Sequence, residues 1–281
     1  MFARMTGHHL VKGHPGVLQQ QLADARHDLR RARRKLAKRQ GAKATSAAAP
    51  GTGFPSDYDA AAGDIIRAVR PFTMTNNDKL FGLIQATRYI VRNKIEGDIV
   101  ECGVWRGGSM QAAARTLLES GDTSRDLYLF DTFEGMSEPT EFDVRRDGRS
   151  AAELMQVKDK STRLWAVASL DDVKDGFQHV PYPAEKVHYV VGKVEDTIPE
   201  HLPERIAILR LDTDWYESTK HELEHAYSRL APGGILIIDD YGHWAGSKKA
   251  TDDFVTALDE PLLLTRLGQG RIGVKPFPRS V

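Results

Sequence analysis

The amino-acid sequence predicts an α/β fold: a doubly wound, mostly parallel sheet of seven strands, with further helices on its N-terminal side. Three observations lead to this fold class. From residue 98 onward, short apolar runs of strand length alternate with helical segments. Glycines or aspartates follow several of these runs, at the sheet edge where open α/β folds bind ligands. The last two runs, 261–267 and 271–275, flank a Gly268-Gln269-Gly270 turn and indicate an antiparallel hairpin.

The individual elements follow from the same pattern. Strands are expected at 98–102, 126–130, 187–191, 205–211 and 235–238, followed by the hairpin. Helices are expected at 58–70, 77–93, 109–120, 216–230 and 248–258. The run Ala231-Pro232-Gly233-Gly234 is interpreted as the stop of the helix before it.

The segment 136–186 is a long insertion with a weaker pattern. It is charged and without a clear period over 140–160, and Ser169 is the expected N-cap of a helix at 169–179. Long insertions at the carboxyl edge of a sheet often form lids or substrate loops. We therefore expect residues 136–186 to contact the substrate, with a plain surface loop as the alternative.

Residues 1–50 differ from the rest of the chain in charge. They carry eleven Lys/Arg and two Asp, a net charge of +9, whereas the whole chain has 39 residues of each sign. Leucines and alanines recur at spacings of four and three over 16–40, which indicates a helix, and 43–55 is typical of a linker. We divide the chain into a partly disordered basic arm with linker (1–50) and a main domain (51–281). The arm is interpreted as a dimer contact, a contact to an acidic surface, or a solvated helix.

Composition excludes several classes of protein. The sequence contains no apolar run near the roughly 20 residues that cross a bilayer, and its first residues lack the apolar core of a signal peptide. Cys102 is the single cysteine, so an internal disulfide is excluded and a thiolate metal site is disfavoured. We therefore expect a cytoplasmic protein.

A glycine-rich loop follows the first strand of the sheet and precedes a helix, at 103–109. Glycines allow a ligand to approach the backbone, and the start of a helix offers free N–H groups. Glu101 would repel a pyrophosphate but suits a cationic amino acid and a sulfonium. The spacing of Glu101, Gly103 and Gly107 therefore favours S-adenosylmethionine over a dinucleotide, although glycines also occur for packing.

Asp131 follows the second strand. An acidic side chain at this position can accept hydrogen bonds from both ribose hydroxyls of a nucleoside. The alternative is a carboxylate that caps a turn or a helix.

Four carboxylates follow two neighbouring strands, Asp212 and Asp214 after one and Asp239 and Asp240 after the other. Uncompensated, they would repel one another and raise one another's pKa values. A divalent cation resolves this conflict, and all-oxygen ligands favour Mg²⁺, with Mn²⁺ or Ca²⁺ as substitutes. We predict Asp212, Asp239 and Asp240 as metal ligands, with helix caps as the alternative for some of them.

These interpretations combine into methyl transfer to a hydroxyl oxygen. The acceptor hydroxyl must lose its proton and lie in line with the sulfonium methyl carbon, at about 3–3.5 Å. Asp214 is the first candidate for the base. Asp212 and His243 are the alternatives.

The motifs resemble the TylF/MycF-type macrocin O-methyltransferase family. The resemblance rests on Thr73-Met74-Thr75 and on the runs 97–109, 129–136, 209–219 and 230–242. It implies the class I methyltransferase (Rossmann-like) fold, S-adenosylmethionine, Mg²⁺ and a homodimer or higher homo-oligomer. It also implies a hydroxyl acceptor on a sugar of a glycosylated natural product or glycolipid. The cofactor-binding residues expected from motifs and resemblance are Thr75, Glu101, Gly103, Trp105, Gly107, Ser109 and Asp131.

Two other functions remain open on the sequence. A catechol-type O-methyltransferase would also use Mg²⁺ but would methylate an aromatic diol. A methyltransferase-like scaffold protein would keep the fold without catalysis.

Overall fold

The computed structural model describes residues 53–156 and 163–278. The chain divides into two units, residues 1–59 and 60–281. Of the first unit only 53–59 are described, where the rings of Phe54 and Tyr58 stack with centroids 5.7 Å apart. The helix expected at 16–40, the basic arm and most of the linker therefore lie outside the described residues.

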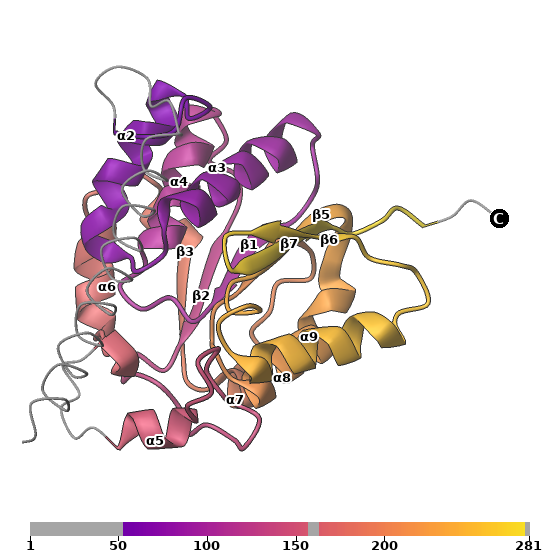
Figure 1. Cartoon of the computed structure of the whole chain (residues 1–281). Coiled ribbons are helices and arrows are strands. Elements are labelled where there is room, and N and C mark those ends of the chain that lie inside the picture. Colours follow the sequence, from indigo (N-terminus) through magenta and orange to yellow (C-terminus); the bar gives the residue numbers. More distant parts are fainter. Residues whose placement is uncertain (1–52, 157–162, 279–281) are drawn as a thin grey trace, which may run out of the picture. The chain divides into compact units, whose positions relative to one another are not determined.

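The second unit is built on a sheet of seven strands in the order β3-β2-β1-β4-β5-β7-β6 (Figure 1). The strands are β1 (Asp98–Cys102), β2 (Leu127–Asp131), β3 (Val187–Val191), β4 (Ile206–Leu211), β5 (Leu230–Ile238), β6 (Leu264–Leu267) and β7 (Gly270–Val274). Neighbours among β1–β5 pair in parallel, and β7 runs antiparallel to both β5 and β6. The predicted doubly wound sheet with a C-terminal antiparallel hairpin is confirmed.

Helices cover both faces of this sheet (Figure 1). One face carries α2 (Ala60–Val69), α3 (Asn77–Arg92), α4 (Gly108–Glu119) and α6 (Leu170–Phe177). The other carries α7 (Val194–Thr197), α8 (Tyr216–Ala226) and α9 (Ala245–Ala257). Short helices complete the connections: α5 (Ala151–Met155), η1 (Arg70–Phe72), η2 (Arg163–Trp165), η3 (Ala184–Lys186) and η4 (Tyr227–Arg229).

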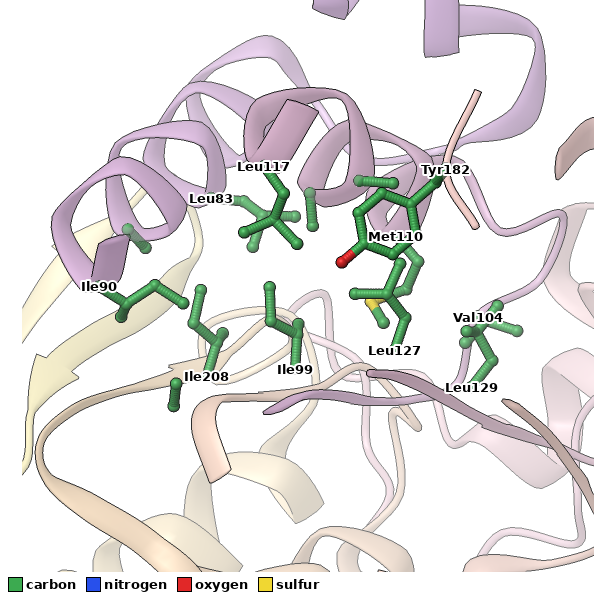
Figure 2. Packing of buried hydrophobic residues seen from close by; sticks show 14 of the residues in the cluster. Leu83, Ile90, Ile99, Val104, Met110, Leu117, Leu127, Leu129, Tyr182 and Ile208 are labelled. Carbon is green, nitrogen blue, oxygen red and sulfur yellow. The ribbon is translucent and has the colours of Figure 1, made fainter. Parts of the chain in front are cut away.

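Alternate strand residues point to opposite faces, which divides the core into two clusters. Figure 2 shows Ile99, Leu127 and Ile208 of the strands facing Leu83 of α3 and Leu117 of α4. The cluster on the other face joins strand residues to α8: Val100, Cys102, Leu209, Leu211, Leu223 and Ala226. The two buried faces hold the carboxyl ends of the strands in fixed positions.

The largest difference from expectation lies between α8 and β5. The helix expected at 216–230 ends at Ala226 and continues as η4, and β5 begins at Leu230. The Ala231-Pro232-Gly233-Gly234 run is therefore part of β5, so its interpretation as a helix stop was wrong. Leu230 pairs with Ile206 and Ile235 with Ile208, so β5 bulges here, and Gly233 takes up the bend with φ +79°.

Smaller differences concern short elements. Helix α9 begins at Ala245, three residues before the expected start at 248, and β6 begins at Leu264 rather than 261. The helix expected at 169–179 is present as α6, and the Ser169 side chain accepts a hydrogen bond from the Asp172 amide at 3.2 Å. Among the described residues, no helix is long and apolar enough to cross a membrane.

Candidate active site

A cavity of about 510 Å³ lies at the carboxyl ends of the parallel strands. Such a volume is typical of sites for small molecules and cofactors. The predicted site residues that line it are Thr75, Gly103, Trp105, Ser109, Asp131, Asp212, Asp214, Asp239, Asp240 and His243. Glu101 and Gly107 do not line the cavity. The structure therefore brings most of the predicted residues to one place.

Backbone conformation and close packing explain why glycine occurs at positions 103 and 107 of the loop. A Cβ at Gly103, where φ is +79°, would lie 2.2 Å from the Asp212 carbonyl oxygen. Glycine here lets the loop after β1 approach the loop after β4. Gly107, with φ +74°, is the N-cap of α4, and a Cβ there would meet Val173 at 3.0 Å. Gly107 thus starts the helix and packs against α6 rather than facing the cavity.

Glu101 lies beneath the cavity wall and is fully buried. Its Oε1 accepts a hydrogen bond from the Ser109 hydroxyl and pairs with the Arg210 guanidinium. Burial raises the pKa of Glu101, and the charge of Arg210 opposes this shift. Its other carboxylate oxygen has no hydrogen-bond partner among the described residues. Glu101 is therefore connected to the cavity indirectly, through Ser109, which lines it, and through Arg210, which pairs with the lining residues Asp212 and Asp239.

Asp131 links the end of β2 to the glycine-rich loop. Its Oδ2 accepts hydrogen bonds from the amides of Val104 (2.8 Å) and Trp105 (3.0 Å), and its Oδ1 accepts from the Phe133 amide (2.8 Å). Burial raises the pKa of Asp131, while these three N–H groups act in the opposite direction. The carboxylate is thus fixed at the cavity wall by the backbone.

The predicted metal ligands form one cluster. One carboxylate oxygen each from Asp212, Asp239 and Asp240 lies within 4.8 Å of the others. Burial, followed by repulsion from neighbouring carboxylates, raises the pKa values of Asp212 and Asp240. Asp240 Oδ2 is buried without a hydrogen-bond partner among the described residues. An all-oxygen donor set with an unpartnered buried oxygen fits a hard divalent cation.

Two cations that the sequence interpretation gave no role contact this cluster. Arg210, 2% exposed, donates to Asp212 Oδ2 (2.7 Å), Asp239 Oδ1 (2.5 Å) and the Thr75 hydroxyl (3.2 Å). Lys79 Nζ pairs with the Asp239 carboxylate and donates to its carbonyl oxygen at 3.0 Å. Burial would raise the pKa of Asp239, but the positive charges of Arg210 and Lys79 outweigh this effect and lower it.

The sequence contains a signal for the role of Arg210 but none for the role of Lys79. Arg210 interrupts the otherwise apolar strand run 206–211, and a charged residue inside a buried strand is a signal for an internal ion pair. Lys79 gives no such signal, because it lies in the first part of a helix 160 residues away from its partner.

Asp214 combines an unusual backbone with a shifted pKa. Its φ is +69°, a conformation that costs a non-glycine residue free energy and that often occurs at functional sites. Burial and then the charge of Asp212 raise the pKa of Asp214 to about 7. A carboxylate of this kind is suited to take a proton near neutral pH.

His243 lies on another part of the same wall. Its Nδ1 is 3.2 Å from the Gln269 side-chain oxygen. Burial lowers the pKa of His243, and the positive charges of Arg146 and Arg145 add to this effect. The neutral imidazole is therefore favoured.

The insertion and two tryptophans form another part of the wall, and residues 192–195 after β3 also line the cavity. Trp215 and Trp244 meet edge to face with ring centroids 4.8 Å apart. The insertion contributes Met136, Ser137, Arg145, Leu164 and Ala166. This side of the cavity is more apolar than the aspartate side.

Comparison with known proteins places the chain in a family. The sequence model of the macrocin-O-methyltransferase (TylF) family matches residues 16–264. The chain belongs to this family. Membership in the TylF family confirms the resemblance seen in the motifs and agrees with the fold and the glycine-rich loop.

Three similar proteins come from Streptomyces and Micromonospora species. One relative is 8-demethyl-8-(2,3-dimethoxy-alpha-L-rhamnosyl)-tetracenomycin-C 4'-O-methyltransferase of Streptomyces olivaceus. The two sequences are 36% identical over 169 residues, and this aligned region covers 60% of this chain and 62% of that protein. The chain is 31% identical to demethyldecarbamoylnovobiocin O-methyltransferase of Streptomyces niveus, over 66% of this chain and 69% of the relative. Mycinamicin III 3''-O-methyltransferase of Micromonospora griseorubida is 34% identical over 60% of this chain and 65% of its own length. The chain thus spans just under two thirds of the first of these relatives.

Solved structures support the fold. The O-methyltransferase NovP superposes with a TM-score of 0.64 at 28% identity, covering 73% of this chain and 83% of NovP. The calicheamicin methyltransferase CalS11 superposes with a TM-score of 0.54 at 18% identity, over 76% of this chain and 91% of CalS11. The second likeness concerns the fold alone. Together they confirm the expected class I methyltransferase fold.

Proposed function

We propose that the chain transfers a methyl group from S-adenosylmethionine to a hydroxyl oxygen of a glycosylated small molecule, and that it needs Mg²⁺ to do so. One observation carries the proposal: Asp212, Asp214, Asp239 and Asp240 converge on a cavity that also contains the glycine-rich loop. Family membership supports O-methyl transfer, because the relatives are named O-methyltransferases.

The cofactor would lie along the loop after β1. In this proposal Asp131 accepts hydrogen bonds from the ribose hydroxyls. The residue lines the cavity, and its Oδ1 accepts one backbone amide (Phe133) against two at Oδ2 (Val104 and Trp105), so Oδ1 has more acceptor capacity left. Gly103, Trp105, Ser109 and Thr75 line the same region. Glu101 would hold Ser109 and Arg210 in place, and Gly107 would fix the start of α4.

The metal would be held by Asp212, Asp239 and Asp240. A divalent cation at these residues would supply Lewis acidity and two fixed positions for acceptor oxygens. Arg210 and Lys79 balance part of the negative charge of the cluster. Glu101 shares Arg210, so four carboxylates (Glu101, Asp212, Asp239 and Asp240) face two cations and, when ionised, retain a net charge of −2, which a divalent cation would neutralise.

The proposed chemistry is a direct displacement. The acceptor oxygen forms a bond to the methyl carbon while the carbon–sulfur bond breaks, and the products are a methyl ether and S-adenosylhomocysteine. Asp214 takes the hydroxyl proton, and its pKa of about 7 suits this role. Asp212, as a ligand, and His243, as a neutral imidazole, remain the alternative bases.

The acceptor proposal rests on the relatives and on the cavity wall. The relatives are named for their acceptors, which are a dimethoxy-rhamnosyl tetracenomycin, demethyldecarbamoylnovobiocin and mycinamicin III. Trp215 and Trp244 are only 2% and 3% exposed and back this side of the cavity. The partly buried Met136 and Leu164 pack against them and line the cavity, which gives an apolar contact for a sugar-bearing acceptor. The predicted homo-oligomer, cytoplasmic location and acidic-surface contact of the arm stay predictions.

The test is methyl transfer to a defined acceptor panel with Mg²⁺ present. The panel contains mycinamicin III, demethyldecarbamoylnovobiocin, a glycolipid with a free sugar hydroxyl and catechol. Mass spectrometry should detect one added methyl group on a sugar-bearing acceptor and none on catechol. Methylation of catechol alone would favour the catechol-type alternative. If S-adenosylhomocysteine failed to bind at all, the scaffold alternative would be favoured.

A further inference from the structure

Asp143 is a fully buried carboxylate in the insertion that no motif singled out. It lies just before a small antiparallel bridge between Val144 and Ser150. Its Oδ2 accepts hydrogen bonds from the Thr140 amide (2.7 Å) and the Thr140 hydroxyl (2.9 Å). Its Oδ1 accepts from the Tyr216 amide at 2.8 Å. One carboxylate therefore connects the insertion to the first residue of α8.

The same carboxylate also touches the start of α9. A Cβ at Gly246 would lie 1.9 Å from Asp143 Oδ1 and 3.0 Å from the Tyr216 amide nitrogen. The residues that precede these helices, Trp215 and Trp244, offer no side-chain cap. The N-terminal ends of both helices thus converge on one negative charge, which their dipoles favour.

Backbone hydrogen bonds strengthen this connection. The Ala245 amide donates to the Val144 carbonyl at 2.8 Å, and the Arg146 amide donates to the His243 carbonyl at 2.9 Å. Asp214 lies two residues before Tyr216, in its strained conformation. The segment 143–146 therefore holds both loops that carry the candidate bases.

We propose that Asp143 is a positioning residue that fixes Asp214 and His243 against the acceptor side of the cavity. The proposal rests on the function proposed above. The cofactor side is independent of Asp143, because Asp131 fixes it through the amides of Val104 and Trp105. Loss of Asp143 should then disturb the acceptor-side loops and leave the cofactor-side loop intact.

Hydrogen exchange of individual amides tests this separation in the full-length protein. In Asp143→Ala, the amides of Tyr216 and Ala245 should exchange at least about tenfold faster. The amides of Val104 and Trp105, which are held by a comparable carboxylate, should not change. Asp143→Asn should give a smaller effect, because its amide oxygen still accepts from Tyr216. Glu153→Ala, an exposed carboxylate of the same insertion, is the matched control.

A second variant keeps the proposal testable if Asp143→Ala does not fold, and kinetics provide a second measurement. Gly246→Ala displaces the Asp143 carboxylate without removing it, and it decides the question if Asp143→Ala fails to fold. With an acceptor from the panel, kcat should fall about tenfold or more while the Kd of S-adenosylhomocysteine stays within about twofold.

Two results would overturn the proposal. One is unchanged exchange at Tyr216 and Ala245 in the variants that fold. The other is equal acceleration at Val104 and Trp105 together with loss of cofactor binding, which would indicate a general structural role. If the wild-type protein methylates no acceptor, the proposed acceptor class fails, whereas the exchange measurement still decides the role of Asp143.

Discussion

Lys79 Nζ lies 3.0 Å from the carbonyl oxygen of Asp239 and also pairs with the carboxylate of the same residue. Helix α3 thereby contacts the carboxyl end of β5, and a lysine shares a carboxylate that we assign to the metal. Burial alone would lower the pKa of Lys79, but the charges of Asp239, Asp240 and Asp212 raise it, so the ammonium form is kept. The charge of Lys79 therefore opposes a divalent cation at this cluster.

Replacing Lys79 by Met should tighten binding of Mg²⁺. The cluster would then carry one more uncompensated negative charge, which favours the cation. Without metal the variant should be less stable by about 3 kcal/mol, because a buried carboxylate loses a partner. Calorimetric titration with Mg²⁺ and denaturant unfolding in EDTA measure the two effects, with Lys79→Arg as the control. Weaker Mg²⁺ binding in the Met variant would show instead that Lys79 helps to hold the ligand set.

Asp239→Asn and Asp240→Asn should abolish turnover while S-adenosylhomocysteine still binds. Each variant removes one anionic ligand but leaves the loop after β1 unchanged. Steady-state assays and calorimetry on the same preparations separate the two effects. Near-normal rates in both variants would remove the metal assignment.

Asp131→Ala should weaken cofactor binding about tenfold or more. The variant loses the proposed ribose contact and leaves the amides of Val104, Trp105 and Phe133 without their acceptor. The Kd of S-adenosylhomocysteine is the measurement, and Asp126→Ala, which removes the carboxylate just before the other end of β2, is the control. Equal affinity in wild type and Asp131→Ala would refute the ribose role.

Turnover should rise with pH along an acidic limb that lies below about pH 7. Asp214 must be ionised to accept a proton, and the bound cation that turnover requires would lower its pKa from about 7. Asp214→Asn should lose the limb together with most of the activity, whereas His243→Asn should keep it. A limb that disappears in His243→Asn and persists in Asp214→Asn would reverse the assignment of the base.

The convergence of Asp212, Asp239 and Asp240 could be predicted from the sequence because it follows from topology. Parallel strands end at the same edge of a sheet, so residues after two neighbouring strands meet there. The glycine-rich loop and Asp131 were located by the same reasoning. For the same reason, the order of the elements along the chain was enough to predict the sheet and its terminal hairpin.

The remaining features depend on contacts that no local pattern encodes. Lys79 and Asp143 each reach a partner far along the chain, and Asp143 sits in a segment without periodicity. The bulge at Gly233 looks like a helix stop in the sequence, because both features use glycine at a positive φ. Glu101 is predicted to bind the cofactor, and the sequence contains no sign that it pairs with Arg210 of the neighbouring strand instead of lining the cavity.

The most direct test compares binding and turnover in Mg²⁺ and in EDTA. S-adenosylhomocysteine is titrated calorimetrically in both conditions, and methyl transfer to the best acceptor of the panel is measured in parallel. We expect binding in both conditions, turnover only with Mg²⁺, and recovery of turnover when Mg²⁺ is added back. Undiminished turnover in EDTA would contradict the metal-dependent mechanism, and absence of binding in both conditions would contradict the methyltransferase site itself.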